Sequence, residues 1–197
     1  MRFAKLSCLL IVLAAVPCFA TTLDIVIDSS SLSPSTSGFI DFYFDGGYPA
    51  TAVISNFSDA GGTLNSTSIT TSGTVSGTLP GDVVMNENGS DYDEGITFGP
   101  LISFDLTLAG VPDGNNEDEF TLTFYNSGNS GGLLTGNNSD YWLVQVLIDT
   151  QGNVTSTEYA NPSHGPSYAD VYVVPEPASW LLCAAAFAGV FFFRRAR

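Results

Sequence analysis

Carboxylates are the side chains that could do chemistry in this chain. It has 197 residues, with 20 Asp and Glu, five Lys and Arg, and one His. All five basic residues lie outside residues 21–177, and this segment holds every carboxylate but no Lys, Arg or Cys. Its carboxylates therefore have no side-chain ammonium or guanidinium partner. They must be hydrated, hydrogen-bonded to backbone N–H groups, or bound to a cation.

Two acidic segments concentrate the oxygen ligands that Ca²⁺ prefers, residues 86–94 and 113–119. In the second, acidic and amide residues alternate as at the start of an EF-hand loop, but Asp118 stands where that loop needs glycine. A pair of hydrated acidic turns is the other interpretation. The candidate calcium ligands are Asp91, Asp93, Glu94, Asp113, Asn115 and Glu117.

The residues that most catalytic sites require are missing from residues 21–177. His164 is the single histidine and sits in a proline-rich segment with no nucleophile-elbow serine beside it, which disfavours a Ser–His–Asp triad. Thiol nucleophiles, Schiff-base lysines and a zinc site with two imidazoles cannot be built from residues 21–177. With 20 carboxylates and no Lys or Arg, this segment has a formal charge of −20, which excludes nucleic-acid binding. We therefore predict a protein that is not an enzyme.

The elements that must position the carboxylates are predicted to be strands. Apolar and polar residues alternate through the segment, no stretch has a capped helical period, and Gly, Asn, Asp and Ser clusters separate the runs. This pattern predicts an all-β domain over residues 21–172, folded as a two-sheet antiparallel β-sandwich, jelly-roll or immunoglobulin-like, with a barrel as the alternative. The expected strands are 22–28, 39–45, 51–57, 66–71, 74–79, 96–98, 101–108, 120–125, 141–149 and 169–174.

The N-terminus has the layout of a secretory signal peptide. Arg2 and Lys5 precede an apolar stretch over residues 6–16, and small residues stand at positions 18 and 20. We expect residues 1–20 to be a signal peptide that is cleaved after Ala20. The carboxylate-rich segment is then exported.

The C-terminus carries a second membrane-directed segment, residues 173–197. It contains Pro175-Glu176-Pro177, then a 16-residue apolar run over 178–193, then a basic tip. As a helix the run is about 24 Å long, slightly short of the ~30 Å hydrocarbon core. Basic residues stay on the cytoplasmic side, so we expect a short transmembrane helix stopped by Arg194, Arg195 and Arg197.

Together, the Pro-Glu-Pro motif, the apolar run and the arginines resemble the PEP-CTERM sorting signal of bacteria. The resemblance implies an exosortase as partner, transient membrane anchoring, and delivery to the cell surface or extracellular matrix. The leading hypothesis is therefore a structural or adhesive surface protein.

Two alternatives remain for the exported domain. An exopolysaccharide-binding module would place aromatics such as Tyr48, Tyr92, Tyr125 or Tyr141 along one face. A hydrolase would need two carboxylates at catalytic separation in a cleft. Trp142, the tryptophan of the exported segment, is expected to pack in the core.

Overall fold

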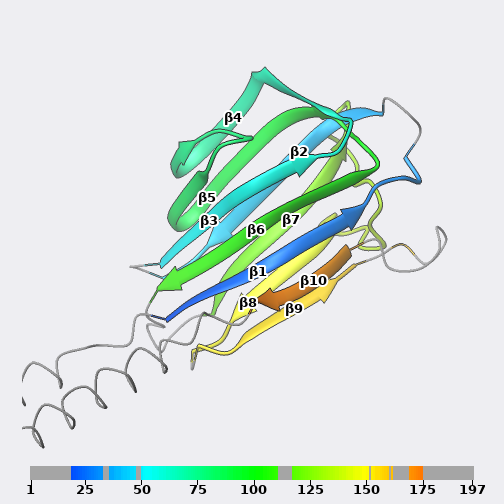
Figure 1. The fold of residues 1–197 in the computed structure, drawn as a ribbon. Coiled ribbons are helices and arrows are strands. Elements are labelled where there is room, and N and C mark those ends of the chain that lie inside the picture. The colour runs from blue at the N-terminus through cyan, green and yellow to red at the C-terminus, as the bar shows by residue number, and fades with distance from the viewer. Residues whose placement is uncertain are drawn as a thin grey trace, which may run out of the picture.

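The computed structural model describes residues 19–32, 36–47, 50–110, 117–150, 152–159, 161 and 169–174. In these residues the fold is all-β, with no helix (Figure 1). The strands are β1 (Phe19–Asp28), β2 (Ser37–Asp45), β3 (Ala50–Asp59), β4 (Thr63–Gly77), β5 (Val83–Thr97), β6 (Leu101–Gly110), β7 (Asp118–Asn126), β8 (Val144–Ile148), β9 (Val154–Glu158) and β10 (Ala169–Val174).

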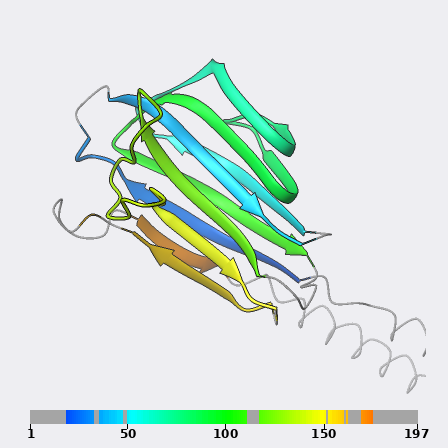
Figure 2. The ribbon, with the colours of Figure 1, turned by 180° about the vertical axis from the view of Figure 1, so that it is seen from behind.

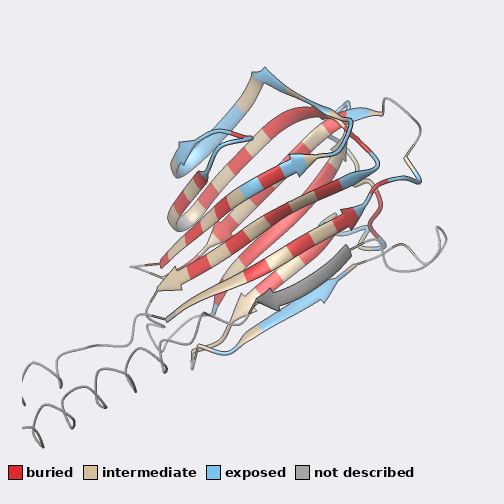
Figure 3. Cartoon of the chain, in the orientation of Figure 1, coloured by how far each residue is buried: buried red, intermediate tan, exposed pale blue. Residues whose placement is uncertain are grey.

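Alternation of the side chains explains why these segments are strands. In β2, Ile40, Phe42 and Phe44 are buried, and the residues between them are only partly buried. The same period of two recurs in β6, where Ile102 and Phe104 point inward. Figure 3 shows this alternation as buried bands along the strands. One face of each such strand thus packs in the core, and the other face is available to solvent or a ligand.

Hydrogen-bond pairing joins the ten strands into a single antiparallel sheet, with the order β10-β1-β6-β3-β5-β2-β7-β8-β9 and β4 paired to β5. The two separate sheets that the sequence predicted are not found. The sheet curls until its edge strands, β9 and β10, approach each other, so it is nearly closed and barrel-like (Figures 1 and 2).

Strand β5 is the joint of this sheet. Residues 83–86 pair with β3, whereas residues 90–97 pair with β2. The sheet therefore has a first arm (β10, β1, β6, β3) and a second arm (β2, β7, β8, β9) whose inner faces meet. Phe42 of the second arm packs edge-on against Phe104 of the first, with ring centroids 5.3 Å apart. Aromatic packing of this kind stabilises the contact between the arms.

Several strand boundaries differ from the prediction. The two strands expected at 66–71 and 74–79 form the one long strand β4, with an irregularity at Gly73, whose φ is +71°. The predicted strand 96–98 is not separate: residues 96–97 are the end of β5, and Phe98 lies just beyond it. Strand β9 was not predicted, because its residues are mostly polar and exposed and show no apolar alternation.

The two ends of the described domain lie side by side. Strand β1 runs antiparallel to β10, and Thr22 pairs with Val174. Strand β1 begins at Phe19, so the predicted cleavage after Ala20 falls within it. Strand β10 continues two residues past the predicted boundary at 172 and ends directly before Pro175.

The predicted sorting motif, arginine tip and apolar run lie outside the described residues, as do residues 1–18 of the predicted signal peptide. Within the described part of the chain, no helix has the length and apolar character needed to span a membrane.

Candidate functional site

Three aspartates, one on β2 of the second arm and two on the part of β5 that pairs with it, converge on the outer face of the sheet. Asp41 of β2 pairs directly with Asp93 of β5, and Asp91 lies two residues before Asp93. The residues next to them in each strand point into the core, so all three aspartates share the outer face. They line a cleft of about 370 Å³ together with Tyr125, Asn129, Ser130 and Tyr141.

Glu94 does not belong to this cluster, contrary to the prediction. Residues 86–94 are part of strand β5 and not a loop, so Glu94 faces the side opposite to Asp93. It is fully buried in the core, where the Tyr92 hydroxyl hydrogen-bonds to its Oε2. Burial raises the pKa of the Glu94 carboxyl, and the Tyr92 hydrogen bond opposes that rise.

Only residues 117–119 of the second predicted calcium segment are described, and none of them lines the cleft. Asp113 and Asn115 lie outside the described residues, and Glu117 is exposed directly before β7. Among the residues described, no group of three or more His, Cys, Asp or Glu side chains is arranged to hold a metal ion. Of the predicted calcium ligands, Asp91 and Asp93 are the two that the described residues bring together.

Burial and their mutual proximity disfavour the ionised form of the cleft aspartates. The pKa of Asp41 is raised to about 9, first by burial, then by its hydrogen bond with Asp91 and by the negative charges of Asp91 and Asp93. Burial and the charge of Asp91 also raise the pKa of Asp93 to about 6, although the Asn129 amide opposes that rise. At neutral pH, Asp41 is thus a carboxylic acid that hydrogen-bonds to Asp91.

Two oxygens of the cleft aspartates have no hydrogen-bond partner. Oδ1 of Asp41 and Oδ1 of Asp93 are both buried and unpaired. The other oxygen of Asp93 accepts a hydrogen bond of 3.1 Å from Nδ2 of Asn129. A buried oxygen without a hydrogen-bond partner destabilises the folded protein. A ligand that donates hydrogen bonds to these two oxygens would remove that cost.

Aromatic side chains flank the cleft. The rings of Tyr125 and Tyr141 pack edge to face at 6.1 Å, and Tyr141 has a φ of +64°, which is uncommon for a bulky residue. Trp142 packs against Tyr159 at 6.2 Å and is partly exposed, so the prediction that it lies in the core was wrong.

The other two tyrosines predicted for a sugar-binding face do not join this pair. Tyr92 is fully buried in the core. Tyr48 lies outside the described residues. Tyr125 and Tyr141 are therefore the part of the predicted aromatic face that the structure brings together.

Asp41 is the residue that sequence reasoning missed. It lies 50 positions before Asp91, and only the pairing register of β2 with β5 brings the two together. The available signal was the alternation of residues 39–45, which places Asp41 opposite the core face. That signal gives the side of the strand but not its neighbour.

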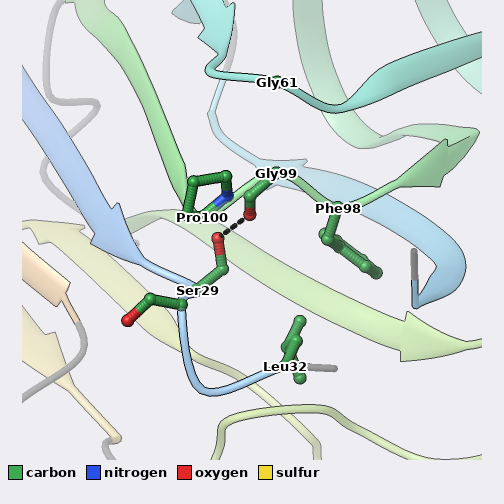
Figure 4. A pocket seen from close by; sticks show the side chains of 7 residues that line it. Ser29, Leu32, Gly61, Phe98, Gly99 and Pro100 are labelled. Carbon is green, nitrogen blue, oxygen red and sulfur yellow. Dashed lines mark hydrogen bonds between the residues drawn. The ribbon is translucent and has the colours of Figure 1, made fainter. Parts of the chain in front are cut away.

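A second cavity, of about 320 Å³, lies where β1 ends and β6 begins (Figure 4). Ser29 and Phe98 line it, and the Ser29 hydroxyl donates a hydrogen bond of 2.5 Å to the Gly99 carbonyl. The Asp59 carboxylate accepts the Gly99 N–H at 2.8 Å. These hydrogen bonds connect two turns. The Ser29 hydroxyl is bonded to a backbone carbonyl and not to a side chain that could act as a general base. We assign this cavity a structural role.

Comparison with family models, with curated proteins and with solved structures finds no match to this chain.

Proposed function

We propose that this chain is an exported protein of the cell surface or extracellular matrix, with a structural or adhesive role and no catalytic one. Residues 1–20 act as a signal peptide, and an exosortase processes the chain at Pro175-Glu176-Pro177. Until then the apolar run 178–193 holds the protein in the membrane as a helix, with the arginine tip on the cytoplasmic side. The two facing arms act as the layers of a sandwich.

The observation that carries this proposal is the pairing of Thr22 with Val174. Thr22 follows the predicted signal-peptide cleavage site closely, and Val174 directly precedes the Pro-Glu-Pro motif. Paired strands lie about 4.8 Å apart, so the chain enters and leaves the domain at one end. Both membrane-directed segments can then reach the same bilayer without a long linker.

Charge supports the same orientation. Residues 21–177 carry 20 carboxylates and no Lys or Arg. Positive charges near a membrane span favour the cytoplasmic side, and this segment has none to resist export. Its negative charge also favours a soluble, non-aggregating state outside the cell.

The test is the fate of the full-length chain in a host that has an exosortase. We expect the wild-type protein outside the cell, beginning at Thr21 and lacking the apolar run and the arginines when its termini are determined by mass spectrometry. A Pro175→Ala, Pro177→Ala double variant should stay membrane-bound with an intact C-terminus.

Pro100→Ala is the matched control, because Pro100 is exposed and lies in the described domain. It should be processed like the wild type. Recovery of unprocessed wild-type chain from the cytosol, or equal processing of the double variant, would contradict the proposal.

A specific observation favours carbohydrate binding as the second candidate function. Tyr125 and Tyr141 line the same cleft as Asp41, Asp91 and Asp93. Aromatic rings beside converging polar groups are typical of small-molecule and sugar sites. Glycosidases hold their two catalytic carboxyl groups about 5–9.5 Å apart, so the hydrogen-bonded pair of Asp41 and Asp91 lies too close together for that chemistry.

A further inference from the structure

We propose that the outer face of the second arm binds an amine-bearing polysaccharide, with the aspartate cleft taking an ammonium group and Tyr125 and Tyr141 contacting the sugar rings. The inference names the ligand of the proposed adhesive role and rests on that role. It does not depend on how the chain is exported or cleaved.

The outer face forms a continuous row across several strands. Asp91, Tyr43, Thr121, Gln145 and Thr157 are successive partners in the registers of β5, β2, β7, β8 and β9. At about 4.8 Å per strand, the row is roughly 19 Å long. A surface row of that length is long enough to contact several sugar units.

In this row a small side chain lies between two larger ones. Thr121 and Thr123 are buried on this outer face. Tyr43 and Gln145 flank Thr121 and remain partly exposed. Gln145 is held in place because its amide donates to Glu119 at 2.6 Å and accepts from the Tyr159 hydroxyl at 2.7 Å. Neighbouring atoms cover the two threonines, so the side chains that a ligand can reach in this part of the row are the partly exposed Tyr43 and Gln145.

Charge at the cleft favours an ammonium group over a neutral hydroxyl. Asp41, Asp91 and Asp93 line one cleft, and no Lys or Arg occurs between residues 21 and 177 to balance the charge of those that are ionised. An ammonium group supplies positive charge and three N–H donors, and Oδ1 of Asp41 and Oδ1 of Asp93 are unpaired acceptors. Hydrogen bonds to charged partners are about twice as strong as neutral ones.

The aromatic pair favours a sugar as the carrier of that amine. Tyr125 and Tyr141 pack edge to face, and both line the cleft together with the aspartates. A ring face binds apolar C–H surface and also attracts a cation placed over it. An amino sugar has an apolar ring face, hydroxyl groups and an amine within one unit.

Binding of oligosaccharides to the full-length protein in detergent tests the inference. Isothermal titration calorimetry at pH 6 would compare glucosamine hexamer, N-acetylglucosamine hexamer and cellohexaose. We expect the glucosamine hexamer to bind at least tenfold more tightly than the other two. Asp93→Asn and Tyr125→Ala should each weaken that binding by about tenfold or more.

Asp105→Asn is the matched control, because it removes one carboxylate from β6, in the first arm. Asp105 accepts a hydrogen bond from Asn56 and is remote in sequence and strand order from the cleft. It should leave the affinity for glucosamine hexamer within twofold of the wild type. Asp93→Asn also keeps the size of the side chain, and a circular dichroism melt verifies that each variant is folded.

Each other outcome overturns the inference in a distinct way. If Asp105→Asn weakens the binding of glucosamine hexamer as much as Asp93→Asn does, the oligosaccharide is attracted to the acidic surface in general. If pentalysine binds as tightly as glucosamine hexamer, the cleft recognises a protein-type cation rather than a sugar. If all three oligosaccharides bind with equal affinity, the amine has no role in binding. Release of new reducing ends from any oligomer indicates a hydrolase. None of these results bears on export, which cell fractionation tests separately.

Discussion

Replacing Tyr92 with Phe is expected to destabilise the domain strongly although it removes a single oxygen. Tyr92 is fully buried. Its hydroxyl accepts a hydrogen bond of 3.0 Å from the Leu79 N–H and hydrogen-bonds to Oε2 of Glu94. The ring itself would remain stacked on Phe42, with centroids 6.2 Å apart. The substitution therefore isolates the effect of the hydroxyl.

The magnitude follows from the groups that lose a partner. The Leu79 N–H and Oε2 of Glu94 both lose the hydroxyl, and Oε1 of Glu94 is already buried without a partner. An unsatisfied buried polar group costs about 1–3 kcal/mol, so two such groups lower the free energy of unfolding by about 2–6 kcal/mol. In a domain of this size each kcal/mol lowers the melting temperature by roughly 2–4 °C.

Urea unfolding followed by circular dichroism measures this loss, with Tyr43→Phe as the matched control. Tyr43 lies on the outer face and is partly exposed, so its variant should stay within about 0.5 kcal/mol of the wild type. If Tyr92→Phe also stays within that range, the hydroxyl does not bridge Leu79 and Glu94 and the reasoning is refuted. An additional Glu94→Gln variant then reports whether the carboxyl is needed at all.

Two further predictions follow from the same kind of reasoning. Because the folded state raises the pKa of Asp41 to about 9 and of Asp93 to about 6, it binds protons that the unfolded chain has released, so the melting temperature should fall as pH rises from about 4 to about 9. Scanning fluorimetry should show a flatter fall for Asp41→Asn, and an unchanged slope would contradict the pKa assignment. Gly99→Ala should cost about 1–3 kcal/mol, because an added Cβ would lie 2.4 Å from the Ala60 carbonyl oxygen. Gly128→Ala, where the nearest atom is 3.3 Å away, should cost less in the same urea titration, and equal costs would count against the steric argument.

Much of the fold could be predicted from the sequence because its strands are strongly patterned. The alternation of Ile102, Phe104 and Leu106 specified both a strand and its buried face, and the structure buries all three. Strand β9 could not be predicted in this way, since its residues are mostly exposed and it is a strand through pairing with β8. Curling of the sheet also depends on long-range pairing, namely the change of β5 from β3 to β2 along its length.

The candidate site shows where local patterns stop being informative. Residues 91–94 read as one acidic segment, and an acidic loop would bring Asp91, Asp93 and Glu94 to one ion. In a strand, successive side chains point to opposite faces, so Glu94 enters the core while its neighbours remain outside. The same period places Asp41 outside, yet its proximity to Asp93 depends on a register fixed by the burial of Phe42 and Tyr92. A one-residue slip would turn Asp41 inward and separate the cluster, so the packing of the core determines whether the site exists.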